Sequence, residues 1–495
     1  MTITVVRKAD LTPRQTAAWL LLIVLVGSLL RFIGLDIQSL WNDELSSVYR
    51  SSYSTAAEVI NQGVLTEFHP PGYHLLLFVV EQLWDDSETA VRMPSAIFGV
   101  LSIIVIFWIG ARFYSRRVGL IAAMLMAVLE FPVYYSQEAR CYAALLLFSM
   151  ASMGCWMEIR QRIVKQERVS WPWMIGYQLS SLASAYFHYF GLLLLAIQAM
   201  FILWEVLRRR CSIGTLLIIY VPIGILYAPW LPFKMKQTSA GTAWISMPSL
   251  GYPFEFLRFL FNRYGGLVII FTIVYLLPFG LGLIGEGKLK NLDDSQKSST
   301  SSDRVLLWWL FLPLGIVLLL SWLYKPMAIH RYLIICLPAA YFLAARSIER
   351  LPINLTVKDL VSILIGLVLV FDLIIIKQYY TKPHKEQFRE AVEIVVGQEK
   401  QYPNSLIVAC SFNKGYFDYY FRHQNSSKRV DFVMCSKEEI QRIKELVGSE
   451  PERYVWLMRG NRKIEEGFLE QLMSGFELIQ HSSLIGADVW LLRSK

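Results

Sequence analysis

Long apolar runs separated by short clusters of Lys and Arg limit the possible folds of this chain more than any other feature. Soluble chains are about 45–50% apolar, whereas this chain of 495 residues is 55% hydrophobic. A helix needs roughly 17–25 apolar residues to cross a bilayer. The pattern predicts a polytopic helical membrane protein with about eleven spans, at residues 16–34, 91–111, 118–135, 141–159, 172–187, 190–207, 213–233, 265–284, 305–324, 332–345 and 360–376.

A shorter run, residues 70–84, determines which loops lie on which side of the membrane. If this run crosses the membrane, the later basic clusters lie on the side of the membrane opposite to the N-terminal basic cluster. If it lies in the interface as an amphipathic helix, all clusters face the cytoplasm together with the N-terminus, as the positive-inside rule requires. We therefore prefer the interfacial helix. This choice also accounts for the net charge of +9 without nucleic acid, and it places the tail from Lys377 outside the cytoplasm.

The polar tail, residues 377–495, is predicted to be a small extracytoplasmic α/β domain that follows a membrane domain at residues 1–376. Apolar alternation indicates strands at 405–410, 430–434, 454–457 and 489–492, and helices at 437–446 and 464–473. Cys410 and Cys435 can pair there, which the sequence does not decide. The other cysteines lie in apolar runs and are interpreted as core residues, and no metal-ligand spacing is present.

Trp41-Asn42-Asp43-Glu44 follows the first span directly. One interpretation is that Asn42 or Asp43 caps a helix. The other is that one carboxylate acts as a general base. Adjacent helical residues point about 100° apart, so one of Asp43 and Glu44 would act while the other orients or binds.

Three further motifs fall in the loops predicted to be outside. They are Glu67-Phe68-His69-Pro70-Pro71-Gly72-Tyr73-His74, then Tyr134-Tyr135-Ser136-Gln137-Glu138-Ala139-Arg140-Cys141-Tyr142, then His330-Arg331-Tyr332. Each has a structural interpretation: a proline turn, an interfacial tyrosine anchor and a snorkelling arginine, respectively. The functional interpretation is that His69 and the arginines bind an anionic lipid phosphate, because Arg suits bidentate phosphate binding and charges near the bilayer usually pair or serve a site.

In this order, and with Arg92-Met93-Pro94-Ser95 opening the second span, the motifs resemble the dolichyl-phosphate-mannose protein mannosyltransferase superfamily. That superfamily includes bacterial aminoarabinose transferases that modify lipid A. The resemblance covers roughly residues 16–376. It implies a GT-C fold with juxtamembrane helices in the first outer loop. It also implies transfer of a sugar from a polyprenyl-phosphate carrier to an acceptor on the extracytoplasmic face, with no obligatory metal.

The resemblance also implies roles for single residues. The acidic residue of the family's first loop corresponds to Asp43, regarded as catalytic, and Glu44 is its neighbour. The aminoarabinose branch has an Arg where this chain has Ser46 and a Lys where it has His69, so neither aminoarabinose nor lipid A is assigned. Phosphate binding is expected of His69, Arg140, His330, Arg331 and Tyr332, and substrate binding of Glu67, Tyr73, Tyr135 and Glu138.

The sequence therefore predicts a hexosyl or pentosyl transferase in a bacterial plasma membrane, inverting, with Asp43 as base. No cofactor, divalent metal or nucleic acid is predicted. The sugar, the acceptor (lipid, protein or glycan) and the oligomeric state are left open. The alternative is a lipid-linked-sugar transporter or flippase. Its buried charges would be Arg31, Glu130, Glu205 and Asp372, but the internal repeat common in transporters is not seen.

Overall fold

The computed structural model describes residues 11–237, 244–264, 294–351, 353–424, 426, 428–448 and 452–495. The chain divides into two compact units, and each is described by itself. The helical unit comprises the chain up to Ile33, Thr55–Leu76 and Arg92–Ile376. The sheet unit comprises Gly34–Ser54, Leu77–Val91 and Lys377–Lys495. The predicted boundary between residues 376 and 377 stays a prediction.

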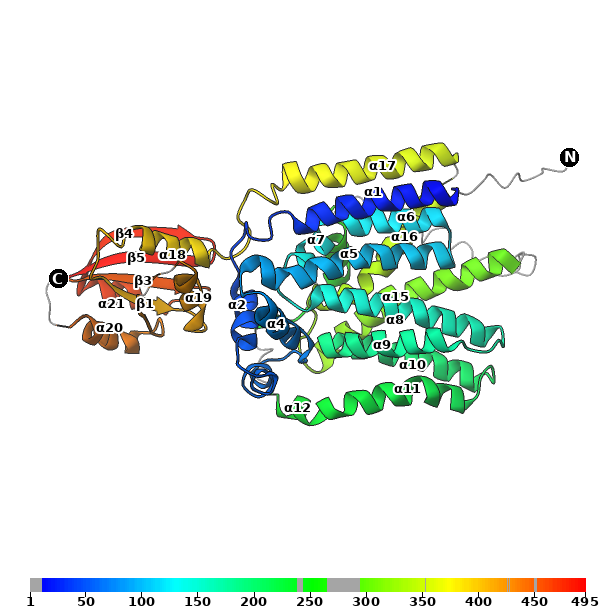
Figure 1. The fold of residues 1–495 in the computed structure, drawn as a ribbon, viewed down its shortest axis with the longest axis horizontal. Helices are drawn as coiled ribbons and strands as arrows, with labels where there is room; N and C mark the ends of the chain where they lie inside the picture. The colour runs from blue at the N-terminus through cyan, green and yellow to red at the C-terminus, as the bar shows by residue number, and fades with distance from the viewer. Residues whose placement is uncertain are drawn as a thin grey trace. The chain divides into compact units, whose positions relative to one another are not determined.

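Among the described residues, 8 helical segments are long and apolar enough to cross a membrane. A bent pair of helices, α6 (Arg116–Val128) and α7 (Glu130–Ser136), makes a ninth. Figure 1 shows the long helices of this part running side by side. The eight are α1 (Pro13–Phe32), α5 (Glu88–Phe113), α8 (Tyr142–Val164), α10 (Phe190–Leu207), Ile213–Lys236 with α11 (Ile213–Tyr227) and α12 (Leu231–Lys236), Asp303–Leu323 in α15 (Asp294–Leu323), Tyr332–Arg350 with α16 (Leu337–Arg350), and Leu355–Ile376 with α17 (Leu355–Phe371).

The polytopic helical fold that the sequence predicts is confirmed. The expected span at 172–187 forms α9 (Trp171–Phe187), which has 17 residues, and the expected span at 265–284 lies outside the described residues. Helices were predicted in the first interhelical loop, and it contains the short α-helices α2 (Asn42–Ser51), α3 (Ala56–Glu58) and α4 (Gly72–Leu83). The 12 residues of α4 rise about 18 Å, which is less than the roughly 30 Å of a hydrocarbon core. The sidedness of the loops stays a prediction.

Arg31, a charge buried in α1, has a structural role at the break between α6 and α7. The last carbonyls of a helix have no intrahelical partner, and α6 ends at Val128. The Arg31 guanidinium donates to the carbonyl oxygens of Met126 at 2.6 Å and Ala127 at 2.9 Å. It also donates to Ser136 Oγ at 3.1 Å. Arg31 therefore satisfies the end of the broken span.

The sheet unit contains a five-stranded sheet in the order β2-β1-β3-β5-β4. β1 is parallel to β2 and β3, and β5 is antiparallel to β3 and β4. Helices lie on both faces of the sheet (Figure 1). The strands are β1 (Leu406–Cys410), β2 (Val430–Phe432), β3 (Tyr454–Gly460), β4 (Phe476–Leu484) and β5 (Ala487–Ser494), and the helices are α18 (Phe388–Gly397), α19 (Gly415–His423), α20 (Ile440–Val447) and α21 (Phe468–Met473).

The predicted small α/β domain is confirmed, with four of its strands and both of its helices near their expected places. β4, α18 and α19 were not expected. Cys410 and Cys435, left open by the sequence, form a disulfide with 5.7 Å between their Cα atoms. The bond joins the end of β1 to the segment after β2, next to the apolar core that α20 and α21 cover.

Candidate functional site

The His-Pro-Pro loop of the helical unit is fixed on two sides. Glu67 is extended, with φ −122° and ψ −179°, and α4 begins after the two prolines at Gly72. A Cβ atom on Gly72 would lie 2.6 Å from the carbonyl oxygen of Tyr186, so only glycine lets α4 approach the end of α9 this closely. From the other side, Gln237 Nε2 donates to the carbonyl oxygen of His69 at 2.9 Å. The loop is therefore held where its side chains can make precise contacts.

Glu67 is the centre of a buried cluster of charged and polar groups. Its Oε1 lies 3.2 Å from Arg140 Nη1 and 3.3 Å from His69 Nδ1. Its Oε2 lies 2.8 Å from His74 Nε2. Burial alone would raise the pKa of Glu67, but Arg140, His74 and His69 together hold this pKa well below its usual value. Glu67 is therefore an anion that orients the cationic and imidazole groups around it.

Arg140 lies in the turn between α7 and α8 and is 4% exposed. Its Nη2 is 3.4 Å from His69 Nδ1. Its backbone is held as well, because Ser95 Oγ donates to the Arg140 carbonyl oxygen at 3.3 Å and contacts the Tyr73 hydroxyl at 3.0 Å. Tyr73, predicted to bind substrate, thus helps to hold the Arg140 backbone through Ser95.

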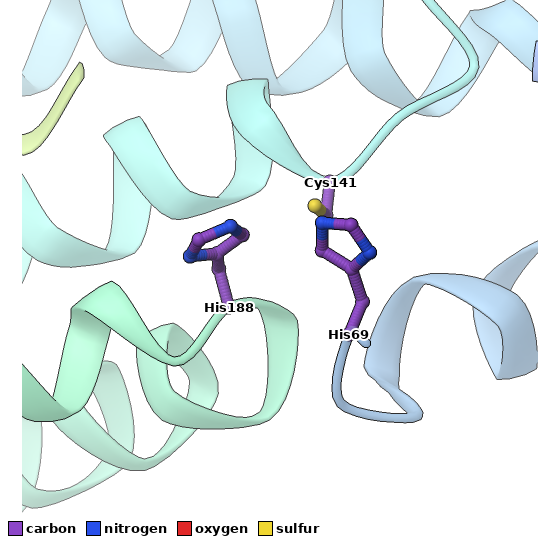
Figure 2. Close-up of side chains that lie close together, drawn as sticks. All are labelled: His69, Cys141 and His188. Atoms are coloured by element: carbon purple, nitrogen blue, oxygen red, sulfur yellow. The ribbon is translucent and has the colours of Figure 1, made fainter. Parts of the chain in front are cut away.

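Aromatic rings line the other side of the cluster. The His188 ring lies 5.2 Å from His69 and 4.9 Å from Tyr332, centroid to centroid. The Arg331 guanidinium lies 5.5 Å from the Tyr142 ring and within 5.9 Å of Tyr332, at cation–π distance. Burial lowers the pKa of both His69 and His188, so both imidazoles are neutral near pH 7. Figure 2 shows the two imidazoles near each other, with the Cys141 sulfur beside the His69 ring.

The structure brings together most of the side chains expected to bind phosphate or substrate: Glu67, His69, Arg140, Arg331 and Tyr332, with Tyr135 stacked edge-on against Tyr142 at 5.2 Å. Glu138 is fully buried in the same turn as Arg140. His330, in contrast, stacks on Tyr252 at 5.0 Å and on Phe259 at 4.6 Å. The sequence analysis did not select His188, although a histidine in a short loop between two predicted spans is a usable signal.

The carboxylates Asp43 and Glu44 belong to the sheet unit. Helix α2 begins at Asn42, so the expectation that Asn42 or Asp43 is its N-cap is wrong. Glu44 is fully buried and forms an ion pair with Lys385 Nζ at 3.1 Å. Asp43 is partly exposed. The sequence analysis missed Lys385 because its partner lies in a distant part of the chain.

Glu386, next to Lys385, completes this second cluster. Its Oε2 accepts a hydrogen bond from the backbone N–H of Asn42 at 2.7 Å. The pKa of Glu386 is raised to about 7, mainly by burial and also by the nearby carboxylates of Asp43 and Glu44, while the hydrogen bond from the Asn42 N–H opposes the shift. The sheet unit therefore gathers three carboxyl groups, of which Glu44 is paired with Lys385.

Comparisons with known proteins agree with the geometry. Residues 68–233 match the sequence profile of the family described as dolichyl-phosphate-mannose-protein mannosyltransferase. A search of curated protein sequences gave no significant match. Among solved structures, ArnT from Cupriavidus metallidurans in the apo state superposes with a TM-score of 0.59 at 12% identity, covering 96% of this chain and 98% of that chain.

Two other solved structures share the fold. ArnT from Cupriavidus metallidurans bound to undecaprenyl phosphate superposes with a TM-score of 0.56 at 11% identity, over 96% of this chain and 98% of that chain. The Archaeoglobus fulgidus oligosaccharyltransferase in complex with Zn and sulfate gives 0.51 at 12% identity, over 94% of this chain and 73% of that chain. At these identities the likeness concerns the fold. Together with the family profile, it confirms the resemblance that the motifs predict.

Proposed function

We propose that this protein is a membrane glycosyltransferase that moves a monosaccharide from a polyprenyl-phosphate carrier to an acceptor hydroxyl. The observation that carries the proposal is the buried cluster in which Glu67 contacts both Arg140 and His69, while the Arg331 guanidinium lies over the Tyr142 ring. The cluster stands on a fold shared with ArnT, one structure of which holds undecaprenyl phosphate. Arg140 is buried and Arg331 is partly exposed. Two such guanidinium groups suit a lipid phosphate, because Arg donates in a planar fork and stays charged at any working pH.

The cationic cluster would stabilise the leaving group. As the bond between the anomeric carbon and the phosphate oxygen breaks, negative charge gathers on the phosphate. Donors that are already oriented stabilise this charge without reorganising, and removing one commonly costs about 10²–10³ in rate. Glu67 supplies the orientation here, since it contacts Arg140 and His69 through one oxygen at 3.2 and 3.3 Å.

Asp43 is the better candidate for the base. Glu44 is fully buried and bound to Lys385, so we assign it as a positioning residue, whereas Asp43 is partly exposed. In the proposed step the acceptor O–H proton passes to Asp43 and the acceptor oxygen bonds to the anomeric carbon. The lipid phosphate then leaves with the electron pair of the broken bond. One displacement inverts the anomeric configuration.

The test is transfer by the purified full-length protein with radiolabelled polyprenyl-phosphate sugars and native membrane extract as acceptor. We expect label in a new product with the wild type, and a loss of about 10²–10⁴-fold with Asp43→Asn, the usual range for a general base. Asp36→Asn is the matched control, because Asp36 is exposed in the same unit. Near-normal transfer by Asp43→Asn would refute the base, and no transfer from any donor would refute the transferase.

The flippase alternative loses support from the buried charges that motivated it. Glu205 accepts from Arg160 and Arg210, each at 3.0 Å. Asp372 accepts from Asn262 Nδ2 at 3.0 Å. These charges, like Arg31, have structural partners, whereas a transport pathway needs groups that a substrate can reach. Movement of lipid-linked sugar across vesicles by a protein that transfers none would favour the flippase.

A further inference from the structure

Three side chains able to bind a metal meet in the helical unit. None of them is one of the carboxylates of the proposed reaction. They are His69, Cys141 and His188, and their ligand atoms all lie within 4.8 Å of one another. They come from three separate connections, before α4, before α8 and between α9 and α10 (Figure 2). All three are buried, with exposed fractions of 8%, 3% and 4%. Far apart in sequence, they form no spacing that a motif search would find.

The contacts of His69 determine which of its nitrogens faces the centre. Its Nδ1 lies 3.3 Å from Glu67 Oε1, so Nε2 is the nitrogen turned inward, and Figure 2 shows one ring nitrogen beside the Cys141 sulfur. A histidine that binds a metal usually donates its other N–H to a carboxylate, which fixes the ring and strengthens the ligand. Glu67 is in position to accept that hydrogen bond, and Arg140 holds Glu67 in turn at 3.2 Å.

His188 presents Nε2 as well, because the backbone N–H of Phe190 donates to its Nδ1 at 3.1 Å. In this arrangement the ring proton is on Nε2. Metal binding through Nε2 places the proton on Nδ1 instead, so the Phe190 contact must open when the metal binds. One backbone hydrogen bond contributes little compared with the binding of Zn²⁺ by three protein ligands. The Phe190 amide therefore reports occupancy of the site.

We propose that His69, Cys141 and His188 form a Zn²⁺ site. A thiolate with two imidazoles is a soft ligand set that suits Zn²⁺ and disfavours Mg²⁺ and Ca²⁺. Tetrahedral Zn²⁺ with bonds of about 2.0–2.3 Å places ligand atoms roughly 3.3–3.8 Å apart, so the three side chains need only small rotations to close on it. The Cys141 thiol proton is released on binding, and the thiolate and Glu67 offset the positive charges of Arg140 and the metal.

The site would tie together three connections that carry the candidate phosphate-binding groups. His69 is itself in the cluster, Cys141 follows Arg140 directly, and His188 contacts Tyr332 at 4.9 Å. This proposal differs from two expectations of the sequence analysis: that no divalent ion is involved, and that Cys141 is only a core residue. It stands independently of the proposed transfer reaction, since nothing in the argument requires a sugar donor.

The first experiment measures metal content. Purified full-length protein is stripped with a chelator, equilibrated with Zn²⁺, freed of excess ion and analysed by elemental mass spectrometry. We expect one Zn²⁺ per chain in the wild type and in Cys155→Ser, the matched control for another cysteine of the same stretch of chain. Cys141→Ser and His188→Gln are expected to bind at least 10–100-fold more weakly, the loss known for contacts outside the ligand shell alone. Equal Zn²⁺ in Cys141→Ser and wild type would overturn the proposal.

A second measurement needs no variant. Co²⁺ in place of Zn²⁺ gives a thiolate-to-metal charge-transfer band in the near ultraviolet only if a cysteine is a ligand. We expect the band in the wild type and in Cys155→Ser. If Cys141→Ser fails to fold, as size-exclusion chromatography would show, the wild-type spectrum decides alone, and its lack of a band would overturn the site. Neither readout uses transfer activity, so failure of the transferase proposal and failure of the metal site are distinguishable.

Discussion

Glu67 in the helical unit and Glu44 in the sheet unit are both buried carboxylates with cationic partners, yet they stand in opposite surroundings. Glu67 contacts Arg140 and two imidazoles, and a second guanidinium, Arg331, lies over the Tyr142 ring, so the positive charge near Glu67 comes from two arginines. Glu44 pairs with Lys385 next to two further carboxyl groups, Asp43 and Glu386. The comparison teaches that a buried ion pair alone does not indicate a function. The net charge of the groups around the pair is more informative. A positive surplus suits a phosphate, and a negative surplus suits the acceptance of a proton.

The strongest way to break this comparison is to remove Lys385. Lys385→Met leaves Glu44 buried without its ion-pair partner, and breaking a buried pair commonly costs about 3–5 kcal/mol. We expect the opening free energy of α2 to fall by this amount, measured by hydrogen exchange of the full-length protein. Lys382→Met, at an exposed position nearby, should change little. Recovery in the double variant with Glu44→Gln would assign the loss to the pair, and unchanged exchange in Lys385→Met would show that the pair is dispensable.

The corresponding test in the helical unit is Arg140→Ala. It removes a donor that Glu67 orients at 3.2 Å, and we expect transfer from a polyprenyl-phosphate sugar to fall by about 10²–10³-fold. Arg140→Lys should retain part of the activity, because it keeps the charge but loses the planar fork. Arg168→Ala, at an exposed site, is the control. Full activity in Arg140→Ala would remove this arginine from phosphate binding.

The sequence predicts the fold better than the site, and particular residues show why. Spans are set by local hydropathy, so a span at residues 141–159 was expected, and α8 runs from Tyr142 to Val164. Strand β4 was not predicted from the sequence, because it is an edge strand that is mostly exposed. It therefore lacks the apolar alternation that indicates a half-buried strand. Helix α18 does leave a trace that the sequence analysis overlooked, because its buried residues Phe388, Ala391, Val392 and Val395 follow the i, i+3, i+4, i+7 spacing of an amphipathic helix.

The candidate site depends instead on contacts between residues distant in sequence. His69, Arg140 and Tyr332 could be selected because their motifs are recognisable, but the ion pair between Glu67 and Arg140 could not. Lys385 carries no local signal, because it lies in a polar connection. Cys141 belongs to a recognised motif, but it opens an apolar run and was interpreted as a core residue. Only the fold brings such residues to their partners.

A smaller effect is expected for the pH dependence of the sheet unit. Burial raises the pKa of Glu386 to about 7 from an ordinary value of 4.5. The folded state therefore binds more protons than the unfolded state between these values, and stability falls as the pH rises through this window. Glu386→Gln should flatten the loss between pH 5 and 7 by about 1–3 kcal/mol, measured by thermal unfolding. Glu393→Gln, at an exposed position, should keep the wild-type slope, and an unchanged slope in Glu386→Gln would contradict the raised pKa.

The smallest effect separates residues within the helical unit. His330 was expected to bind phosphate with Arg331, but its ring stacks almost parallel on Tyr252, with 9° between the planes at 5.0 Å. Burial lowers the pKa of His330, so the ring is neutral and attracts an anion only weakly. His330→Phe preserves the stacking, and we expect transfer to stay within about threefold of wild type, since aromatic contacts of this kind are worth about 0.5–1.5 kcal/mol and are kept. A loss as large as that of Arg140→Ala would place His330 among the phosphate-binding groups and extend the positive surplus beyond the Glu67 cluster.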